Sequence, residues 1–335
     1  MDRERGIENK FEYRLVDAEN YTDKELQALI EAPGHKITDL RDISVEVPSA
    51  PDHKEEVMVG SLHLEGTEGK AILVPEEHIA ILILYKPVMA QRDIWKNAPE
   101  VLFTLEKYGW DESADAGDRE MATRALSLYL GLDVSSPVTK KFDEQTGKTV
   151  SIRPFYHGYD WVSASIELPE EKVDRLFRND QYKQIAVLNY ITGKLDPNAF
   201  NMLVTETDKE TPKLRTIDES YTFPTNKLLL AYSKIRESIS ENSSISGAQA
   251  GMQVSVENGK HVYRKTSLDE SMIDTLKKAL EKQDEISELL KTYKIPDASI
   301  NDMFWRIKYM LELNSYITPE EGRNLVDWQT KKEQE

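Results

Sequence analysis

The sequence of 335 residues contains no cysteine, and this absence excludes several kinds of site. Without thiolates there is no disulfide framework, no cysteine nucleophile, no iron–sulfur cluster and no zinc site with sulfur ligands. Histidine is also scarce, with six residues scattered along the chain. Metal chemistry would therefore have to rest on carboxylates.

Basic residues are few relative to acidic ones. Lys and Arg number 43 against 60 Asp and Glu, which gives a formal net charge of −17. Because an acidic chain repels the phosphate backbone of nucleic acids, we expect no nucleic acid as a main partner.

Long apolar runs are missing as well. The first ten residues are mostly charged, and the longest apolar run, residues 79–85, is far too short to span a bilayer. We therefore expect no transmembrane segment and a soluble, cytoplasmic protein. With 39% hydrophobic residues the chain can still bury a substantial core. Its length suggests about two domains or one bilobal unit.

The first half of the chain has the pattern of a small antiparallel sheet that holds one helix. Residues 55–87 are strand-like, and they are interrupted by a Glu-Gly-Thr-Glu-Gly turn that contains Gly66 and Gly69. Apolar residues at helical spacing predict a helix over 117–130, and a hairpin is expected over 138–156.

Helices dominate after a change in chain character near residues 157–165. A second hairpin, over 203–217, interrupts them, and a serine-rich stretch near 238–247 is expected to be a loop. The predicted class is α+β, with an extension over 1–50, a lobe with a sheet over 51–158 and a mainly helical lobe over 159–335. The apolar spacing predicts helices over 169–177, 181–191, 228–239, 268–293, 300–313 and 319–328.

Five polar residues occur in an order that phosphoryl transfer would need. Lys86 ends the apolar strand, and Glu120 begins the following helix. Asp196 and Asn201 precede the second hairpin, and Asp218 follows it. Phosphoryl transfer from a nucleotide needs a lysine on the phosphates, a carboxylate that orients the acceptor hydroxyl, and an asparagine plus an aspartate that hold magnesium. The residue order therefore favours a kinase reaction.

These residues lie in motifs that resemble the phosphatidylinositol kinase-like branch of the protein kinase superfamily, which includes type II phosphatidylinositol 4-kinases and HipA-type serine/threonine kinases. The similar pieces lie within residues 55–230, about half of the chain. They are Ile-Leu-Ile-Leu-Tyr-Lys-Pro at 81–87, Arg-Glu-Met-Ala at 119–122, Leu-Gly-Leu at 130–132 with Pro137, the loop 193–204, and Ile217-Asp218 followed by Phe223-Pro224.

The resemblance implies a bilobal, protein kinase-like fold that transfers the γ-phosphoryl group of ATP with Mg²⁺ or Mn²⁺. It implies that Lys86 contacts the phosphates and that Glu120 pairs with this lysine. It also implies that Asp196 is the catalytic aspartate, whereas Asn201 and Asp218 bind the metal.

The sequence departs from the family at several points. Pro197 follows the catalytic aspartate where relatives often have Arg or His, and Glu219-Ser220 stands where Asn-Gly is typical. The turn with Gly66 and Gly69 also carries two acids. We therefore expect these two glycines to contribute to nucleotide binding as a hairpin turn that lies over the nucleotide, rather than as a specific phosphate cradle. Glu219 either alters the metal preference or adds a solvated charge.

The candidate residues also have plain structural interpretations. Lys86 can be a solvent-facing strand end, and Glu120 can be a first-turn acid that the helix dipole favours. Asp196 and Asn201 can cap backbone groups in a helix-to-strand turn. The aromatic cluster Phe304, Trp305 and Tyr309 recurs at helical spacing and is expected in the core.

The expected function is that of an atypical serine/threonine protein kinase that phosphorylates a protein hydroxyl. A phosphoinositide kinase is the second interpretation, although the chain has no polybasic cluster for a membrane surface. A nucleotide-binding pseudokinase that acts as a scaffold is the third. An enzyme of this type can also be a bacterial effector that is secreted into a host cell.

Overall fold

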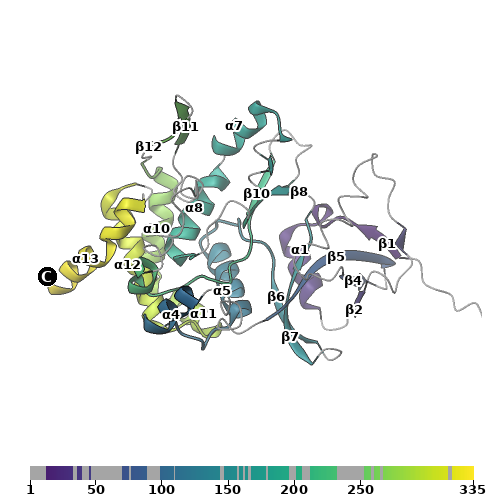
Figure 1. Cartoon of the computed structure of the whole chain (residues 1–335). Coiled ribbons are helices and arrows are strands. Elements are labelled where there is room, and N and C mark those ends of the chain that lie inside the picture. Colours follow the sequence, from purple (N-terminus) through teal and green to yellow (C-terminus); the bar gives the residue numbers. More distant parts are fainter. Residues whose placement is uncertain are drawn as a thin grey trace, which may run out of the picture. The chain divides into compact units, whose positions relative to one another are not determined.

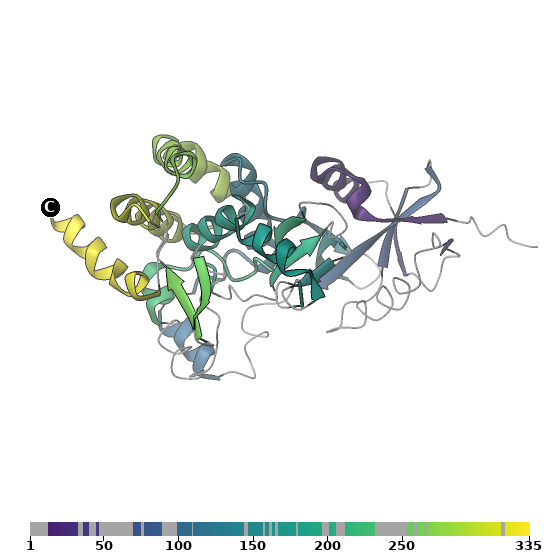
Figure 2. The same cartoon turned by 90° about the horizontal axis from the view of Figure 1, so that it is seen from above.

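The computed structural model shows an α+β protein with a seven-stranded mixed sheet and many helices (Figures 1 and 2). The chain forms two compact units. The first comprises Met1–Val88 and Ser136–His157, and the second comprises Met89–Ser135 and Gly158–Glu335. The structure describes residues 13–32, 36–39, 45–46, 70–74, 77–88, 99–108, 110–143, 147–156, 158–160, 163–164, 167–178, 180–195, 201–205, 212–231, 253–257, 260–264, 267–315 and 319–335.

The first unit holds the seven-stranded sheet. The strand order is β2-β4-β5-β1-β3, and β7 pairs with both β5 and β6. The strands are β1 (Tyr13–Val16), β2 (Lys36–Asp39), β3 (Val45–Glu46), β4 (Lys70–Val74), β5 (Ile79–Pro87), β6 (Thr139–Asp143) and β7 (Lys148–Pro154).

Strand β5 organises this sheet because it pairs with three neighbours. It is antiparallel to β4 and β7, as the sequence predicted, but it is parallel to β1. The expectation of a purely antiparallel sheet is therefore wrong. Parallel neighbours need a long crossover connection, here the segment that contains β2, β3 and β4, and such a pairing leaves no local turn signal in the sequence.

Helix α1 (Asp23–Glu31) packs against this sheet. A capping box begins the helix, in which the Glu25 backbone N–H donates to Thr22 Oγ1 and the Glu25 carboxylate accepts from the Thr22 backbone N–H. Ile30 lies in one core cluster with Ile72 and Ile83 of the sheet. The segment 13–46 thus contributes strands and a helix to the first unit, a role that the sequence left open.

The second unit is mainly helical. Its strands form a three-stranded sheet, β10-β9-β8, and a separate hairpin, β11-β12. The strands are β8 (Gly158–Asp160), β9 (Met202–Thr205), β10 (Lys213–Thr216), β11 (Gln253–Glu257) and β12 (Lys260–Arg264). The helices are α4 (Pro99–Lys107), α5 (Ala116–Tyr129), α7 (Glu170–Arg178), α8 (Asp180–Thr192), α10 (Glu270–Glu281), α11 (Gln283–Thr292), α12 (Asp297–Leu313) and α13 (Pro319–Gln334).

One hydrophobic core holds these helices together. Helix α8 is buried along most of its length, with Ile185, Val187 and Leu188 fully enclosed although they point in different directions. Leu126 of α5 and Phe304 of α12 lie in the same cluster. The helix on which Glu120 lies is therefore anchored to the core of the second unit.

Most predicted helices and both predicted hairpins are confirmed, but one helix is wrong. The apolar pattern predicted a single helix over 268–293, whereas the chain turns at Lys282 (φ −102°, ψ 24°) and forms α10 and α11. The buried residues Leu276 and Leu290 stay in phase across this turn. Because no Gly or Pro marks the turn, the apolar periodicity alone could not reveal it.

Several predictions fall outside the described residues. These are the strand before residue 66, the turn with Gly66 and Gly69, and the serine-rich stretch near 238–247. Of the helix predicted over 228–239, the described part is residues 228–231, and it is helical; the observed helix already begins at residue 226.

The predicted boundaries at residues 50 and 158 remain a prediction. The compact units divide the chain differently, because Met89–Ser135, with α4 and α5, belongs with the second unit.

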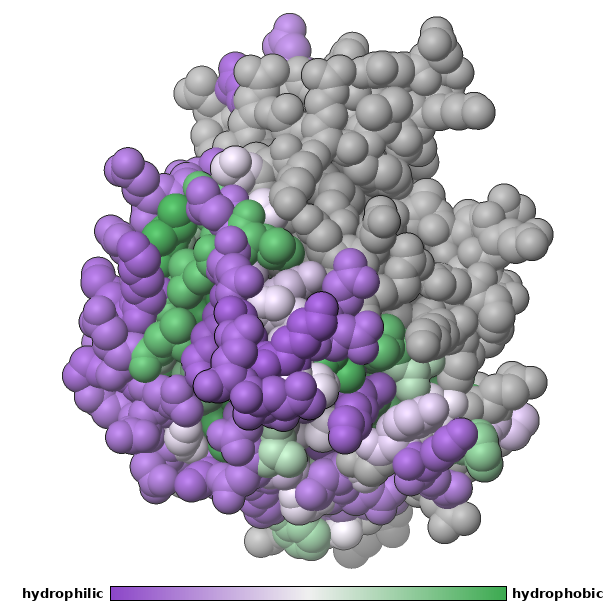
Figure 3. Space-filling view, turned by 90° about the vertical axis from the view of Figure 1, so that its left-hand side faces the viewer, coloured by the Kyte–Doolittle hydropathy of each residue, from purple (hydrophilic) through white to green (hydrophobic). Residues whose placement is uncertain are grey.

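No described helix is long and apolar enough to cross a membrane. On the face shown in Figure 3, hydrophilic residues make up most of the coloured surface, with smaller apolar areas between them.

Candidate functional site

The structure describes Lys86, Glu120, Asn201 and Asp218 among the predicted site residues. Lys86 is half-buried in β5 of the first unit, opposite Ser151 of β7. Glu120, Asn201 and Asp218 belong to the second unit. The expected pairing of Lys86 with Glu120 therefore stays a prediction, and Asp196, Gly66 and Gly69 lie outside the described residues.

Glu120 is held inside the second unit rather than at a helix end. Helix α5 begins with a capping box between Asp115 and Asp118, and Asp118 is the acid of its first turn. Glu120 lies beyond that turn and is 3% exposed. Its interpretation as a first-turn acid is therefore wrong, because its carboxylate points into the protein, where it needs a partner.

Ser220 brings the carboxylates of Glu120 and Asp218 together. Its Oγ lies 2.8 Å from Glu120 Oε1 and 2.9 Å from Asp218 Oδ1. A serine hydroxyl has one hydrogen, so it donates to one of these oxygens at a time. Two acidic side chains, one from α5 and one from the segment after β10, therefore share a single donor in the interior of this unit.

The hairpin β9-β10 brings Asn201 next to Asp218. Thr216 lies opposite Met202 in the register, and the next backbone bond runs from Ile217 N to Asn201 O at 3.0 Å. Asp218 then adopts a left-handed conformation with φ 55°. Aspartate tolerates this region better than most residues, but surrounding contacts still have to hold it there.

The oxygen atoms of this cluster suit a hard divalent cation. Magnesium prefers one or two protein oxygens together with phosphate and water oxygens. Asp218 offers a carboxylate and Asn201 an amide oxygen, both half-buried. Within the described part of the chain, no group of three or more Asp, Glu or His side chains could hold a metal by itself. The residues present thus fit a metal that is also bound by a nucleotide.

Lys194 and Glu219 form a buried ion pair beside this cluster. Lys194 Nζ lies 2.9 Å from Glu219 Oε1, and the two side chains are 1% and 4% exposed. The same ammonium donates to Ile217 O at 2.7 Å and to Thr216 Oγ1 at 3.2 Å. The interpretation of Glu219 as a solvated charge is therefore wrong, because its carboxylate is enclosed and paired.

Two buried arginines hold the chain that follows Asp218. Arg119 donates to Thr222 O at 2.7 Å, and Arg306 donates to Pro224 O at 3.3 Å. Burial lowers the pKa of each guanidinium to about 10, so both stay charged at neutral pH. Local sequence patterns could not reveal these contacts, because the bonded residues lie 103 and 82 positions apart in the chain.

Gly193 allows Arg306 and Pro224 to approach the end of α8. It has φ +63°, and a Cβ at this position would lie 3.1 Å from Arg306 Cζ and 3.2 Å from Pro224 Cδ. Helix α8 ends at Thr192, directly before this glycine. The turn that leads to Asp196 therefore packs directly against the segment after Asp218.

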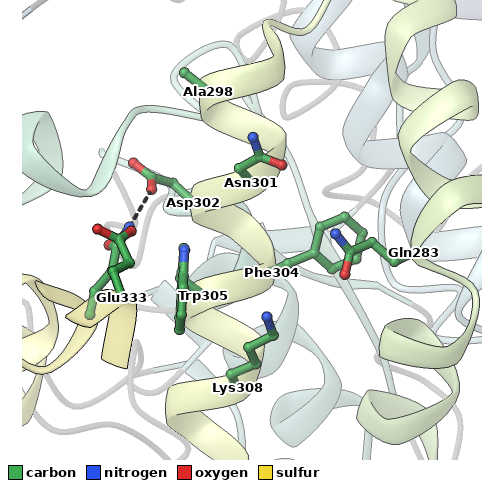
Figure 4. Close-up of a pocket in the computed structure, with 9 residues that line it drawn as sticks. Gln283, Ala298, Asn301, Asp302, Phe304, Trp305, Lys308 and Glu333 are labelled. Atoms are coloured by element: carbon green, nitrogen blue, oxygen red, sulfur yellow. Dashed lines mark hydrogen bonds between the residues drawn. The ribbon is translucent and has the colours of Figure 1, made fainter. Parts of the chain in front are cut away.

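A separate pocket of about 340 Å³ lies on helices α11, α12 and α13 (Figure 4). Trp305 is half-buried and lines this pocket, so its expected place in the core is wrong, whereas Phe304 and Tyr309 are buried as expected. The pocket is lined by Gln283, Ala298, Asn301, Asp302, Phe304, Trp305, Lys308, Gln329 and Glu333.

The carboxylates of this pocket already have partners. Gln329 Nε2 donates to Asp302 Oδ1 at 3.1 Å, shown as a dashed line in Figure 4, and to Glu333 Oε1 at 2.9 Å. Lys308 Nζ lies 4.5 Å from the centroid of the Trp305 ring. None of the four described site residues lines the pocket, so it is distinct from the cluster around Asp218.

Known proteins resemble this chain in structure but not detectably in sequence. No protein-family model matches this chain, and no curated protein matches it. The structure is similar to a crystal structure of the Golgi casein kinase, with 12% identity and a TM-score of 0.38, over 88% of this chain and 86% of that chain. It is also similar to the Helicobacter pylori proinflammatory kinase CtkA, with 10% identity and a TM-score of 0.35, over 79% of this chain and 93% of that chain.

Proposed function

We propose that this chain is an atypical protein kinase that transfers the γ-phosphoryl group of ATP to a serine or threonine hydroxyl. The observation that carries the proposal is the meeting of Glu120, Ser220 and Asp218 beside Asn201. These residues come from three segments that lie far apart in the sequence: helix α5, the residue before β9 and the segment after β10. They meet at one place in the second unit. A fortuitous match of residue order would not require this convergence.

The proposed roles follow from the chemistry of the side chains. Asn201 and Asp218 hold Mg²⁺ or Mn²⁺ through oxygen atoms, and Ser220 orients the Asp218 carboxylate by hydrogen bonding. A metal held by these two residues would supply positive charge that neutralises the phosphate oxygens during transfer. Asp196 orients the acceptor hydroxyl and receives its proton, and Lys86 contacts the phosphates.

A label-transfer assay tests the reaction. Purified protein is incubated with radiolabelled ATP and Mg²⁺ or Mn²⁺, together with a generic protein substrate or phosphoinositide vesicles. We expect label on serine or threonine of the protein substrate or of the chain itself. Label in lipid alone would replace the protein acceptor with a phosphoinositide. Metal-dependent ATP binding without any transfer would indicate a pseudokinase, and absence of binding would refute the proposal.

Lys86 provides a matched test within the same assay. Lys86 lies on β5 and Lys140 on β6, the two strands that flank β7. Both lysines are half-buried, and both have Ser151 of β7 as their cross-strand partner. Lys86→Met should reduce transfer by several orders of magnitude with little change in thermal unfolding. Lys140→Met should leave transfer within a few fold of the unsubstituted protein. Equal effects of the two substitutions would contradict a phosphate contact by Lys86.

A further inference from the structure

Buried cationic side chains of the second unit hold the backbone of the segment that carries Asp218. Lys194, Arg119 and Arg306 are 4%, 1% and 0% exposed. Their hydrogen bonds to main-chain carbonyls run from Lys194 to Ile217, from Arg119 to Thr222 and Phe223, and from Arg306 to Pro224. Charge-assisted hydrogen bonds in a dry interior are strong, and breaking one leaves a buried charge unpaired. This segment is therefore fixed over most of its length.

Lys194 differs from the two arginines because it contacts both sequence neighbours of Asp218. Its ammonium binds the carbonyl of Ile217 on one side and the carboxylate of Glu219 on the other. Thr216 also donates its hydroxyl to Glu219 Oε1, which closes the network. Asp218 thus lies between two residues that one buried lysine holds in place.

The backbone conformation of Asp218 explains why such a hold is needed. A non-glycine residue with φ 55° pays a conformational cost and keeps this conformation only when its surroundings enforce it. Backbone bonds support the same segment from the side of α8, from Leu195 N to Tyr221 O at 2.9 Å and from Phe223 N to Thr192 O. None of these backbone bonds contacts Ile217 or Glu219 directly.

From these contacts we propose that Lys194 is a positioning residue for Asp218. Its ammonium fixes the Ile217 carbonyl on one side of the metal-binding residue and the Glu219 side chain on the other, and so preorganises the ligand. This inference rests on the proposed function, because the metal is what Asp218 would bind. Lys194 itself touches neither the nucleotide nor the acceptor in this scheme.

A purely structural role is the alternative. A buried ion pair often adds little net stability relative to apolar residues of similar size, whereas removal of one partner is costly. Lys194→Met alone would leave the Glu219 carboxylate buried and unpaired, so loss of folding would be expected under either role. The informative protein is the double variant Lys194→Met/Glu219→Met, which leaves no unpaired charge.

Two measurements on the double variant separate the roles. The first is the Mn²⁺ concentration that half-saturates ATP binding, measured by calorimetry, and we expect it to rise about tenfold or more. The second is hydrogen exchange of the backbone amides at 216–220, and we expect faster exchange there with little change in α8. Lys183→Met is the control, because Lys183 lies on α8 and pairs with Asp269, away from this segment.

The outcomes decide both proposals separately. A double variant with unchanged Mn²⁺ dependence and unchanged exchange at 216–220 would overturn the positioning role. If Lys183→Met shifts both quantities as strongly, the effect is general and the positioning role is likewise overturned. If the unsubstituted protein binds no metal–nucleotide complex, the proposed function fails. The exchange measurement alone then decides whether Lys194 anchors the Asp218 segment.

Discussion

Ser220 Oγ donates a hydrogen bond to Glu120 Oε1 at 2.8 Å, although the two residues lie 100 positions apart in the chain. Ser220 is also within 2.9 Å of Asp218, so a single small side chain joins helix α5 to the segment after β10. A glycine at this position could make neither contact, because it has no side-chain hydroxyl.

The first prediction concerns this hydroxyl. Ser220→Ala should lower the free energy of unfolding by about 1 kcal/mol or more, because it removes the donor shared by two buried or half-buried carboxylates. It should also weaken metal-dependent nucleotide binding. Urea unfolding and calorimetry measure the two effects.

Ser287→Ala is the matched control for Ser220. Ser287 Oγ donates to the Gln283 carbonyl within its own helix, and such a bond adds little where alanine is the better helix former. We expect this variant to be nearly as stable as the unsubstituted protein. Equal losses in both variants would contradict a special role for Ser220.

A second prediction compares two glycines with the same backbone conformation. Gly193 and Gly131 have φ +63° and +70°, but a Cβ at Gly131 would meet no atom within 4 Å. Gly131→Ala should cost about 1 kcal/mol, the strain of a left-handed alanine. Gly193→Ala should cost more, because its Cβ also presses on Arg306 and Pro224. Thermal unfolding of both variants measures the difference, and an equal loss would show that Arg306 gives way without cost.

The sequence predicted the elements that surround the site better than it predicted the contacts within it. The buried strand β5, the helix α5 and the hairpin β9-β10 were all expected, because apolar periodicity and turn residues are local signals. The parallel pairing of β1 with β5 was missed, because it depends on a partner far away in the sequence.

The burial of charged residues in the site was likewise not predictable from local sequence patterns. Lys194 follows a helix-ending glycine, a context typical of solvent-exposed lysines, so nothing in the sequence indicated its burial with Glu219. The sequence motif around Glu120 assigns no role to Arg119, yet this arginine is buried against Trp110, whose ring centroid lies 4.1 Å from Arg119 Cζ. Which polar residue becomes buried depends on packing between elements, and periodicity does not report it.

The third prediction concerns acid stability. Asp269 caps the start of α10, and its pKa is lowered from 3.8: burial alone would raise it, but hydrogen bonds from Ser271, Met272 N and Lys183 outweigh that effect. A carboxyl with a lowered folded-state pKa stabilises the fold above its unfolded pKa. This contribution is lost as the pH falls from 3.8 through the lower folded-state value.

Asp269→Asn tests this contribution because asparagine caps a helix about as well as aspartate. At neutral pH the variant should be less stable than the unsubstituted protein, since it lacks the charge that pairs with Lys183. Well below pH 3.8 the two proteins should have nearly equal urea midpoints. A stability difference that stays constant across this range would contradict the lowered pKa.

The last prediction separates a catalyst from a nucleotide-binding scaffold, and it depends on different roles for Asp196 and Asp218. If Asp196 orients the acceptor hydroxyl, it acts in the transfer step and contributes little to ATP affinity. Asp196→Ala should then bind the magnesium–ATP complex within a few fold of the unsubstituted protein but lose transfer. Asp218→Asn should weaken both binding and transfer, because it removes the charge that binds the metal.

Asparagine is the appropriate replacement for Asp218 because it tolerates the left-handed conformation at φ 55° and keeps the side-chain shape. Loss of binding in Asp218→Asn with unchanged thermal unfolding would therefore report lost metal binding rather than a distorted backbone. Calorimetry and label transfer on the same preparations give both quantities. If Asp196→Ala retains full transfer, Asp196 is not the catalytic aspartate; if it loses ATP binding as completely as Asp218→Asn does, the proposed division of roles between the two aspartates is wrong.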